Sequence, residues 1–410
     1  MILNVCNHFI YFVISRINFL KMEYFMKFRY YNFLILFLSF IFPENSGKFS
    51  PDDYLNYQKQ QIEQFQNYKQ SVTAQYQVYE KEEEETFEQY KKEIEQKWEE
   101  FKSPSPKVFV EYSEDLNSRQ SINFEQGEVQ IEVIIESNEL EKEDNPVETK
   151  ETLIKEKLTN ELVSLIKKKA DDNQPILENQ LEDKNGKPIN EENSKDVLDD
   201  LIDEKKIQRN KYKSKDGLNR IRYSLKVPLK KNHLDERVKR FKTEILKQSK
   251  KWKIDPSIVF ALMEAESAFN PRAKSHIPAY GLMQLVPKSG ARDAYRYVYE
   301  VDKLVTGEYL YKPVNNIELG CAYLSKIRYY YFENIKDDNL AYICSIAAYN
   351  TGIGNVSKTL CGKPFTNPAA DVANSMDSEE LYNKLISELE YEEARNYLKR
   401  VWSYKDKYSF

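Results

Sequence analysis

Residues Glu266–Leu285 read ESAFNPRAKSHIPAYGLMQL, and this stretch decides the fold of the chain. It puts a carboxylate near the end of an apolar helix and follows it with a glycine turn and a second apolar segment. The helix has its own start signal, because Asp255 is a good N-cap and Pro256 suits the first helical position. The pair Asn270-Pro271 ends it. This order of elements predicts a cleft that contains one acid.

The carboxylate of this stretch, Glu266, lies about one turn from the C-terminal end of the predicted helix. The other residues on its face of the helix are apolar and recur at helical spacing: Val259, Leu262, Met263 and Phe269. Burial and the negative end of the helix dipole both disfavour the charged form, so we expect the pKa of Glu266 to be raised. A carboxyl group that stays protonated near neutral pH is what protonation of a glycosidic oxygen requires.

Glu264 is the alternative acid in the same helix. It lies two positions away and therefore points to nearly the opposite side of the helix. Phe260, Ala261 and Ala268 would surround it there. The helical pattern alone leaves the choice between the two carboxylates open.

Short motifs around and after this stretch occur in a fixed order. They are Glu266-Ser267, Phe269-Asn270-Pro271, Gly281-Leu282-Met283-Gln284, Ala348-Tyr349-Asn350-Thr351-Gly352, and the segments Asn315–Leu324 and Glu392–Val401. In these motifs the chain resembles the lytic transglycosylases with a lysozyme-like fold. Six matches in one order over about 150 residues form a strong signal, whereas any one of them alone would be weak. The segments YSEDLNSRQSINFEQGEVQIEVI and NGKPI also resemble the amino-terminal domain of C-type murein transglycosylases.

The resemblance implies cleavage of the β-1,4 bond between N-acetylmuramic acid and N-acetylglucosamine in peptidoglycan, without water. Glu266 would protonate the leaving oxygen and then, as a carboxylate, accept the proton of the muramic 6-hydroxyl, which gives a 1,6-anhydro product. One group can serve both steps because each step restores the form that the next one needs. Ordinary glycosidases instead pair two carboxylates across the bond. The resemblance implies no cofactor.

The resemblance also assigns substrate-binding roles to six further residues. Ser267 would support the acid or an acetamido group, and Met283 and Gln284 would line the sugar cleft. Tyr349 and Asn350 would face the reacting sugar, and Tyr397 would hydrogen-bond Glu266. Each has a simpler alternative, since a tyrosine or a methionine in an apolar run most often serves packing.

Two other functional classes fit the same motifs. A hydrolytic muramidase on this fold would differ only in its product, which would carry a reducing end in place of an anhydro ring. A non-catalytic wall-binding or scaffold protein would have lost the acid, and the intact Glu266 argues against this class.

Composition limits the partners. The net charge of −5 gives no reason to expect nucleic acid. The four cysteines do not form a disulfide framework or a metal-ligand spacing, and Cys321 and Cys344 fall in apolar runs where we expect small core residues. Only three histidines are present, so we expect no histidine-based metal site.

We expect a mainly α fold: a lysozyme-like all-α catalytic domain preceded by a small α+β domain and a long N-terminal helix. The predicted limits are 1–47 for a signal peptide or N-terminal membrane anchor, 48–102 for the long helix, 103–232 for the α+β domain and 233–410 for the catalytic domain. The α+β domain is indicated by the strand-like segments KVFVEYSED, SINFEQGE, VQIEVIIE and IRYSLKVPL, with a helix expected over Glu148–Lys169. It contains nothing that resembles a catalytic constellation, which favours a scaffold or binding role.

The first 47 residues are interpreted as a targeting region. Lys27 and Arg29 precede the apolar run Phe33–Phe42, which is short beside the about twenty residues of a spanning helix. A cleaved secretory signal is favoured over an anchor. No cysteine that could accept a lipid follows the run. We therefore expect the protein in the periplasm or cell envelope, with membrane association left open and peptidoglycan glycan strands as its partner.

Between Tyr54 and Phe101 the sequence repeats with a period of eleven residues. The repeating unit is an aromatic pair three residues apart: Tyr54/Tyr57, Phe65/Tyr68, Tyr76/Tyr79, Phe87/Tyr90 and Trp98/Phe101. Eleven residues are almost three helical turns, so the pairs form one stripe on a continuous helix. The helix could be a solvated spacer, a coiled-coil seam or a surface that lies on a membrane or wall component. Because apolar stripes of this length are rarely left bare in water, we expect self-association through the 54–101 helix.

Overall fold

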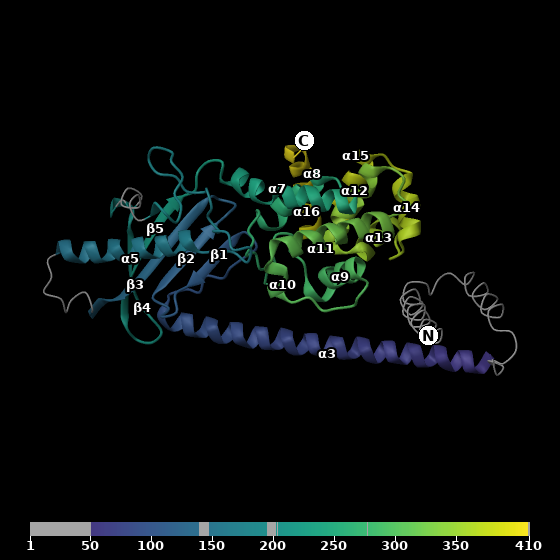
Figure 1. Cartoon of the computed structure of the whole chain (residues 1–410), viewed down its shortest axis with the longest axis horizontal. Helices are drawn as coiled ribbons and strands as arrows, with labels where there is room; N and C mark the ends of the chain where they lie inside the picture. Colours follow the sequence, from purple (N-terminus) through teal and green to yellow (C-terminus); the bar gives the residue numbers. More distant parts are fainter. Residues whose placement is uncertain (1–50, 139–146, 195–201, 203, 277, 409–410) are drawn as a thin grey trace, which may run out of the picture. The chain divides into compact units, whose positions relative to one another are not determined.

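The computed structural model describes residues 51–138, 147–194, 202, 204–276 and 278–408 (Figure 1). The chain divides into two compact units, 1–80 and 81–410, and each is described by itself. The expected signal peptide or anchor, 1–47, lies outside the described residues. Among the described helices, none is both long and apolar enough to cross a membrane.

Helix α3 (Pro51–Lys97) carries the aromatic repeat but ends before the last pair. The prediction of a helix through Phe101 is therefore wrong at its C-terminal end. Trp98 is 1% exposed and packs edge-on against Tyr112 with ring centroids 5.6 Å apart, and the Phe101 ring stacks on the same tyrosine at 6.0 Å. Trp98 Nε1 also donates to the Leu116 carbonyl across 2.9 Å. The last pair gains more contact by leaving the helix and packing on the sheet than by extending the stripe.

The sheet has five antiparallel strands in the order β1-β2-β3-β5-β4. Their bounds are β1 (Val108–Tyr112), β2 (Ser118–Asn123), β3 (Glu128–Glu136), β4 (Gln208–Lys213) and β5 (Asn219–Pro228). Gly127, at a φ of 69°, lies in the turn that joins β2 to β3. The chain then returns through α5 (Val147–Lys167), whose apolar side packs on the sheet at Leu158 and Leu162. The predicted helix and three of the four predicted strands are confirmed, whereas β2 begins three residues before the predicted segment SINFEQGE and ends at Asn123, so most of that segment forms the turn.

The two faces of the sheet differ. One face, with Ile131 and Leu225 at its centre, forms an apolar core with α5. The other face combines a small apolar cluster, which includes Tyr112 and Ile134, with a buried ion pair between Arg119 Nε and Glu132 Oε2 at 2.6 Å. The Arg119 guanidinium also lies 4.6 Å from the Trp98 ring centre. The end of α3 is therefore fixed to the sheet by charge and stacking as well as by apolar contact.

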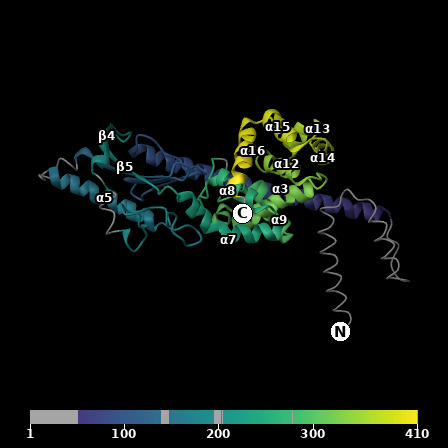
Figure 2. The same cartoon turned by 90° about the horizontal axis from the view of Figure 1, so that it is seen from above.

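The rest of the chain is helical and forms a second apolar core. Its α-helices are α7 (His233–Trp252), α8 (Pro256–Ser267), α9 (Arg292–Tyr299), α10 (Gly307–Tyr311), α11 (Pro313–Lys326), α12 (Asp338–Thr351), α13 (Ile353–Cys361), α14 (Thr366–Asn374), α15 (Ser378–Glu388) and α16 (Glu392–Lys405). Helix α16 lies against both α8 and α12 (Figure 2). Cys321 and Cys344 are unbonded and fully buried in this core, as expected. The predicted fold class, mainly α with a small sheet, is confirmed.

Candidate active site

Helix α8 begins as its sequence predicts and is buried almost throughout. The Asp255 carboxylate accepts from the Ser257 backbone N–H across 2.8 Å, and Pro256 occupies the first turn. Within α8 only Pro256 and Glu266 are not buried. A partly exposed carboxyl group at the end of a buried helix is a group that a ligand can reach.

The carboxyl group of Glu266 is held by one short hydrogen bond. Tyr397 of α16, only 2% exposed, donates its hydroxyl to Glu266 Oε1 across 2.6 Å. Within the described residues, no hydrogen-bond partner is recorded for Oε2, so that oxygen can carry a proton toward a ligand.

Burial raises the pKa of Glu266 from an ordinary value of 4.5 to about 7. The hydrogen bond from Tyr397 opposes this effect, and so do the charges of Arg400 and Lys107, while the charge of Glu393 adds to it. Near neutral pH both the protonated and the charged form of the side chain are therefore populated. A group poised in this way can both give and take a proton.

Glu264, the alternative acid, has a structural role. Lys407 Nζ lies 2.7 Å from its Oε1, and the Tyr408 hydroxyl donates to its Oε2 across 2.7 Å. The residue is 8% exposed. Both oxygens are thus occupied in holding the end of the chain, and of the two carboxylates only Glu266 presents an oxygen that is not already bonded.

Ser267 and Met283 lie in the core and not on an open surface. Ser267 is fully buried, and its hydroxyl lies 2.7 Å from the Leu282 carbonyl and 3.1 Å from the Met263 carbonyl. Met283 is fully buried, with its side chain packed against Gly320. In this structure neither side chain reaches the surface on which a sugar would lie.

Tyr349 and Gln284 lie beside the turn that carries Met283. Tyr349 is 9% exposed, and its hydroxyl donates to the Met283 carbonyl across 3.0 Å. Gln284 Nε2 donates to the Gly281 carbonyl across 2.9 Å, while its Oε1 is buried and has no hydrogen-bond partner among the described residues. The hydrogen bond from Nε2 therefore fixes the amide group, while its oxygen accepts no recorded hydrogen bond. Asn350, next to Tyr349, is partly exposed.

Asn316 of α11 organises this turn, and sequence reasoning missed it. It is fully buried, its Oδ1 accepts from the Met283 backbone N–H across 2.8 Å, and its Nδ2 donates to the Tyr280 carbonyl across 2.8 Å. It also bonds the Leu310 carbonyl. The residue falls inside the motif Asn315–Leu324, which was noted without a role. A buried asparagine that satisfies backbone groups on two other segments leaves no local sequence signal.

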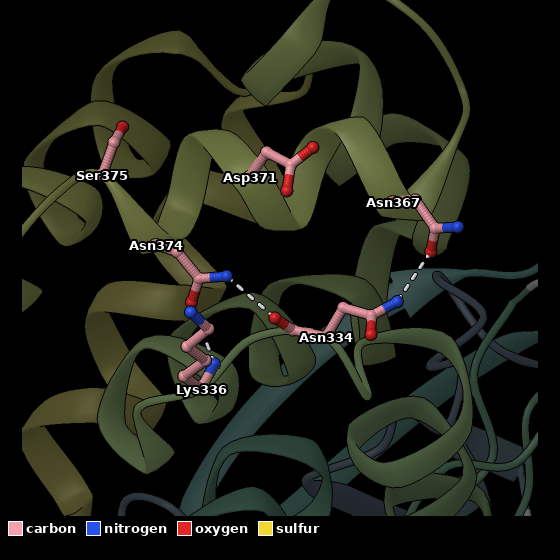
Figure 3. Close-up of a pocket in the computed structure, with 6 residues that line it drawn as sticks. All are labelled: Asn334, Lys336, Asn367, Asp371, Asn374 and Ser375. Atoms are coloured by element: carbon pink, nitrogen blue, oxygen red, sulfur yellow. Dashed lines mark hydrogen bonds between the residues drawn. The ribbon is translucent and has the colours of Figure 1, made fainter.

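A separate polar depression of about 460 Å³ lies between the segment that precedes α12 and the region of α14 (Figure 3). It is lined by Asn334, Lys336, Asn367, Asp371, Asn374 and Ser375. Several of its amides bond one another, as Asn334 Nδ2 does with Asn367 Oδ1 across 2.9 Å. None of the predicted site residues lines it. In the part of the chain that the structure describes, no group of three or more metal-ligating side chains comes together either.

Comparison with known proteins gives matches over both the helical part and the sheet. The family described as transglycosylase SLT domain matches residues 243–369, and the family described as membrane-bound lytic murein transglycosylase C, N-terminal domain, matches residues 58–240. A protein of Klebsiella pneumoniae named membrane-bound lytic murein transglycosylase C is 31% identical over 303 residues, covering 72% of this chain and 80% of that protein. The protein of the same name from Salmonella arizonae is 29% identical over 302 residues, with the same coverage.

Solved structures are similar over a smaller part of the chain. A lytic transglycosylase Slt from Pseudomonas aeruginosa is 29% identical with a TM-score of 0.30, over 40% of this chain and 23% of that one. A soluble lytic transglycosylase from Escherichia coli is 24% identical with a TM-score of 0.32, over 42% of this chain and 25% of that one.

Proposed function

Because the chain belongs to the family of membrane-bound lytic murein transglycosylase C, we propose that Glu266 is the single acid–base group with which it cleaves peptidoglycan. The protein is a peptidoglycan lytic transglycosylase, an enzyme of the cell envelope where its substrate lies. One observation carries the assignment of the acid. Glu266 alone in α8 combines partial exposure, a pKa near 7 and an oxygen with no recorded partner among the described residues.

The proposed reaction uses this carboxyl group twice. In the first step Glu266 Oε2 donates its proton to the oxygen that joins N-acetylmuramic acid to N-acetylglucosamine, and the bond from the muramic anomeric carbon to that oxygen breaks. In the second step the Glu266 carboxylate takes the proton of the muramic 6-hydroxyl while that oxygen bonds to the anomeric carbon. The acid is restored, and the products are an anhydromuramic end and a free 4-hydroxyl.

The surrounding residues suit these two steps. Between the steps Glu266 is an anion, and the hydrogen bond from Tyr397 stabilises it. We assign the partly exposed Asn350 to sugar binding. Ser267 and Tyr349 have a structural role, because their hydroxyls donate to the Leu282 and Met283 carbonyls in the turn that leads to Gln284.

Replacing Glu266 with glutamine tests the proposal. Glu266→Gln keeps the size of the side chain and removes its titratable proton, so turnover of purified sacculi should fall about a hundredfold or more. Glu264→Gln is the matched control, since it removes the negative charge opposite Lys407 and leaves the acid in place. Its turnover should stay near wild type.

Mass spectrometry of the released muropeptides separates the functional classes. An anhydro end is lighter than a reducing end by one water, so reducing ends would show a hydrolytic muramidase. If the wild-type protein releases no muropeptides, it is a binding protein and not an enzyme. Near wild-type turnover by Glu266→Gln would mean that another group is the acid.

We also propose that the domain limits lie near 47, 102 and 232. Two separate apolar cores, one of the sheet with α5 and one of the helical part, support the last boundary. The names of the relatives suggest a membrane association, for which the segment 1–47 is the candidate.

Self-association is assigned to the N-terminal part of α3. Leu55 and Ile62, seven residues apart, are 50% and 42% exposed, whereas the pairs from Phe87 onward pack against other parts of the same chain. Deleting residues 51–79 should therefore lower the sedimentation coefficient to that of a monomer and leave turnover of soluble glycan strands unchanged. If the deletion leaves the oligomeric state as it was, this part of the helix is a spacer.

A further inference from the structure

The end of α8 is built into the sheet's core. Ala268 and Phe269, the two residues after the helix, both adopt the left-handed conformation, at φ of 50° and 59°. Residues other than glycine hold this conformation only where their surroundings fix it. The Ala268 side chain packs in the core formed by the sheet and α5, whereas the Phe269 ring packs in the helical core. Directly after Glu266-Ser267, one side chain of the chain therefore lies in the core of the sheet before the next returns to the helical core.

One buried arginine joins these two parts. Arg237 of α7 is 2% exposed, and its Nε donates to the Ala268 carbonyl across 2.9 Å. Its other nitrogens reach the sheet region, where one lies 2.6 Å from Gln180 Oε1 and the other 2.9 Å from the Phe124 carbonyl. A single guanidinium thus binds the end of α8 and two points of the α+β part.

His233, one turn earlier in α7, completes the set of acceptors. Its Nδ1 lies 2.9 Å from Arg237. Burial and the charge of Arg237 lower the pKa of His233 to about 4, so the ring is neutral near pH 7 and can accept a hydrogen bond. All but one of the N–H groups of the guanidinium therefore have an acceptor.

We propose that Arg237 is a positioning residue for catalysis, which fixes the left-handed end of α8 to the sheet and so keeps Glu266 within hydrogen-bond distance of Tyr397. The inference rests on the proposed role of Glu266 as the acid. Glu266 lies two residues before Ala268, and its partner Tyr397 belongs to α16, which does not touch Arg237 in any recorded hydrogen bond of the described residues. A shift of the helix end would therefore move Glu266 relative to its tyrosine.

A second contact holds the same segment from the sheet side. Asn270 Nδ2 donates to the Pro106 carbonyl across 3.0 Å, next to Lys107, whose charge acts on Glu266. The α+β part, which has no catalytic constellation of its own, thereby contributes to the reaction by fixing the position of the acid.

Arg237→Lys is the test variant. It keeps the positive charge, but one ammonium group cannot reproduce the fork that reaches Ala268, Phe124 and Gln180 together. We expect kcat on soluble glycan strands to fall tenfold or more with KM within twofold. The alkaline limb of the pH profile should move to lower pH, because water reaches a displaced carboxyl group and burial is the main cause of its raised pKa.

Arg240→Lys is the matched control. Arg240 lies one turn further along α7 and also binds the α+β part, at Asp172 across 2.6 Å and at the Pro175 carbonyl across 2.7 Å, but no hydrogen bond to the α8 end is recorded for it. Its kcat and pH profile should stay as in the wild type even where the thermal midpoint falls. Equal losses of kcat in both variants, or a kcat of Arg237→Lys within twofold of wild type, would overturn the proposal.

If Arg237→Lys does not fold, Gln180→Leu replaces it, since this removes one anchor of Arg237 and leaves the arginine in place. It should lower kcat threefold or more with the same shift of the pH profile, and an unchanged kcat would overturn the proposal. Failure of the proposed function is seen separately, because it would appear as an active Glu266→Gln. An inactive Glu266→Gln beside a fully active Arg237→Lys would overturn only the role of Arg237.

Discussion

Glu266 and Tyr397 face each other across 2.6 Å from helices α8 and α16, so the state of the acid depends on a residue 131 positions away. Burial raises the pKa of the carboxyl group and the tyrosine limits that rise. The balance leaves a group that is neither firmly charged nor firmly neutral near pH 7. Such a balance suits a reaction in which one carboxyl group must serve first as acid and then as base.

Tyr397→Phe should lower the turnover and raise the pKa of Glu266. A hydrogen bond to a charged group contributes about 1.5–3 kcal/mol, which corresponds to a loss of about ten- to a hundredfold in kcat. The first step needs protonated Glu266, so the rate falls as pH rises through its pKa of about 7. Because the tyrosine lowers that pKa, removing it should move the alkaline limb to higher pH. The pH profile of kcat measures both effects, and a limb that moves to lower pH would contradict this account.

At the scale of single residues, the sequence predicted the position of Glu266 at the end of its helix and its raised pKa, but only part of its surroundings. The apolar spacing around Glu266 and the motif that follows it are local, so they can be read from the chain. Ser267 and Met283 belong to the same motifs, yet their side chains lie in the core. A motif records which residue types are needed, and it does not record whether a side chain points to a ligand or to its own protein.

At the scale of elements, the segment between α8 and η3 (Pro287–Ala291) is held by Asn316 of α11. Asn316→Ala would leave the Met283 N–H and the Tyr280 carbonyl without their buried partner. Each unpaired group costs about 1–3 kcal/mol, so the free energy of unfolding should fall by about 2–6 kcal/mol for the two groups together. Chemical denaturation with urea measures the loss. Asn315→Ala is the control and should lose far less, because Asn315 is partly exposed and its side chain has one recorded hydrogen bond among the described residues, to the Tyr309 carbonyl.

The strand that sequence reasoning missed lacks an apolar period. Strand β4 reads QRNKYK and is exposed along almost its whole length. It is an edge strand that pairs with β5 through its backbone, and its lysines are typical of protected edges. Backbone pairing leaves no mark in a hydrophobic pattern. Helix α8, by contrast, carries its cap, its first-turn proline and its apolar faces in adjacent residues, and the prediction for it is confirmed.

At the scale of the whole unit from Lys81 onward, the sheet and the helices should unfold in one transition. Arg237 and Ala268 take part in both, so neither core can open without exposing groups of the other. Tryptophan fluorescence can test this in the Trp252→Phe/Trp402→Phe variant, where Trp98 reports on the sheet. Its thermal midpoint should coincide with that of helical circular dichroism. Two midpoints separated by more than about 4 °C, the shift that follows from about 1 kcal/mol in a domain of this size, would contradict a single transition.

The burial of Arg237 could not have been read from the sequence. It lies in the segment HLDERVKRFK, where charged residues are frequent and most are exposed. Three of its four acceptors, at Phe124, Gln180 and Ala268, come from distant positions, and two of these three are backbone carbonyls. Only the folded chain brings them to one point.

The packing of Ala268 in the core of the sheet also limits how such proteins can exchange domains during evolution. A recombination event just before His233 would join the sheet of one ancestor to the helices of another. The product would keep both halves intact, yet the new junction would fit only if a small side chain at 268 met a cavity of matching size and if position 180 still offered an acceptor to Arg237. The sheet and the catalytic helices should therefore be inherited as one block, even though the sheet holds no residue that touches the substrate in the proposed reaction.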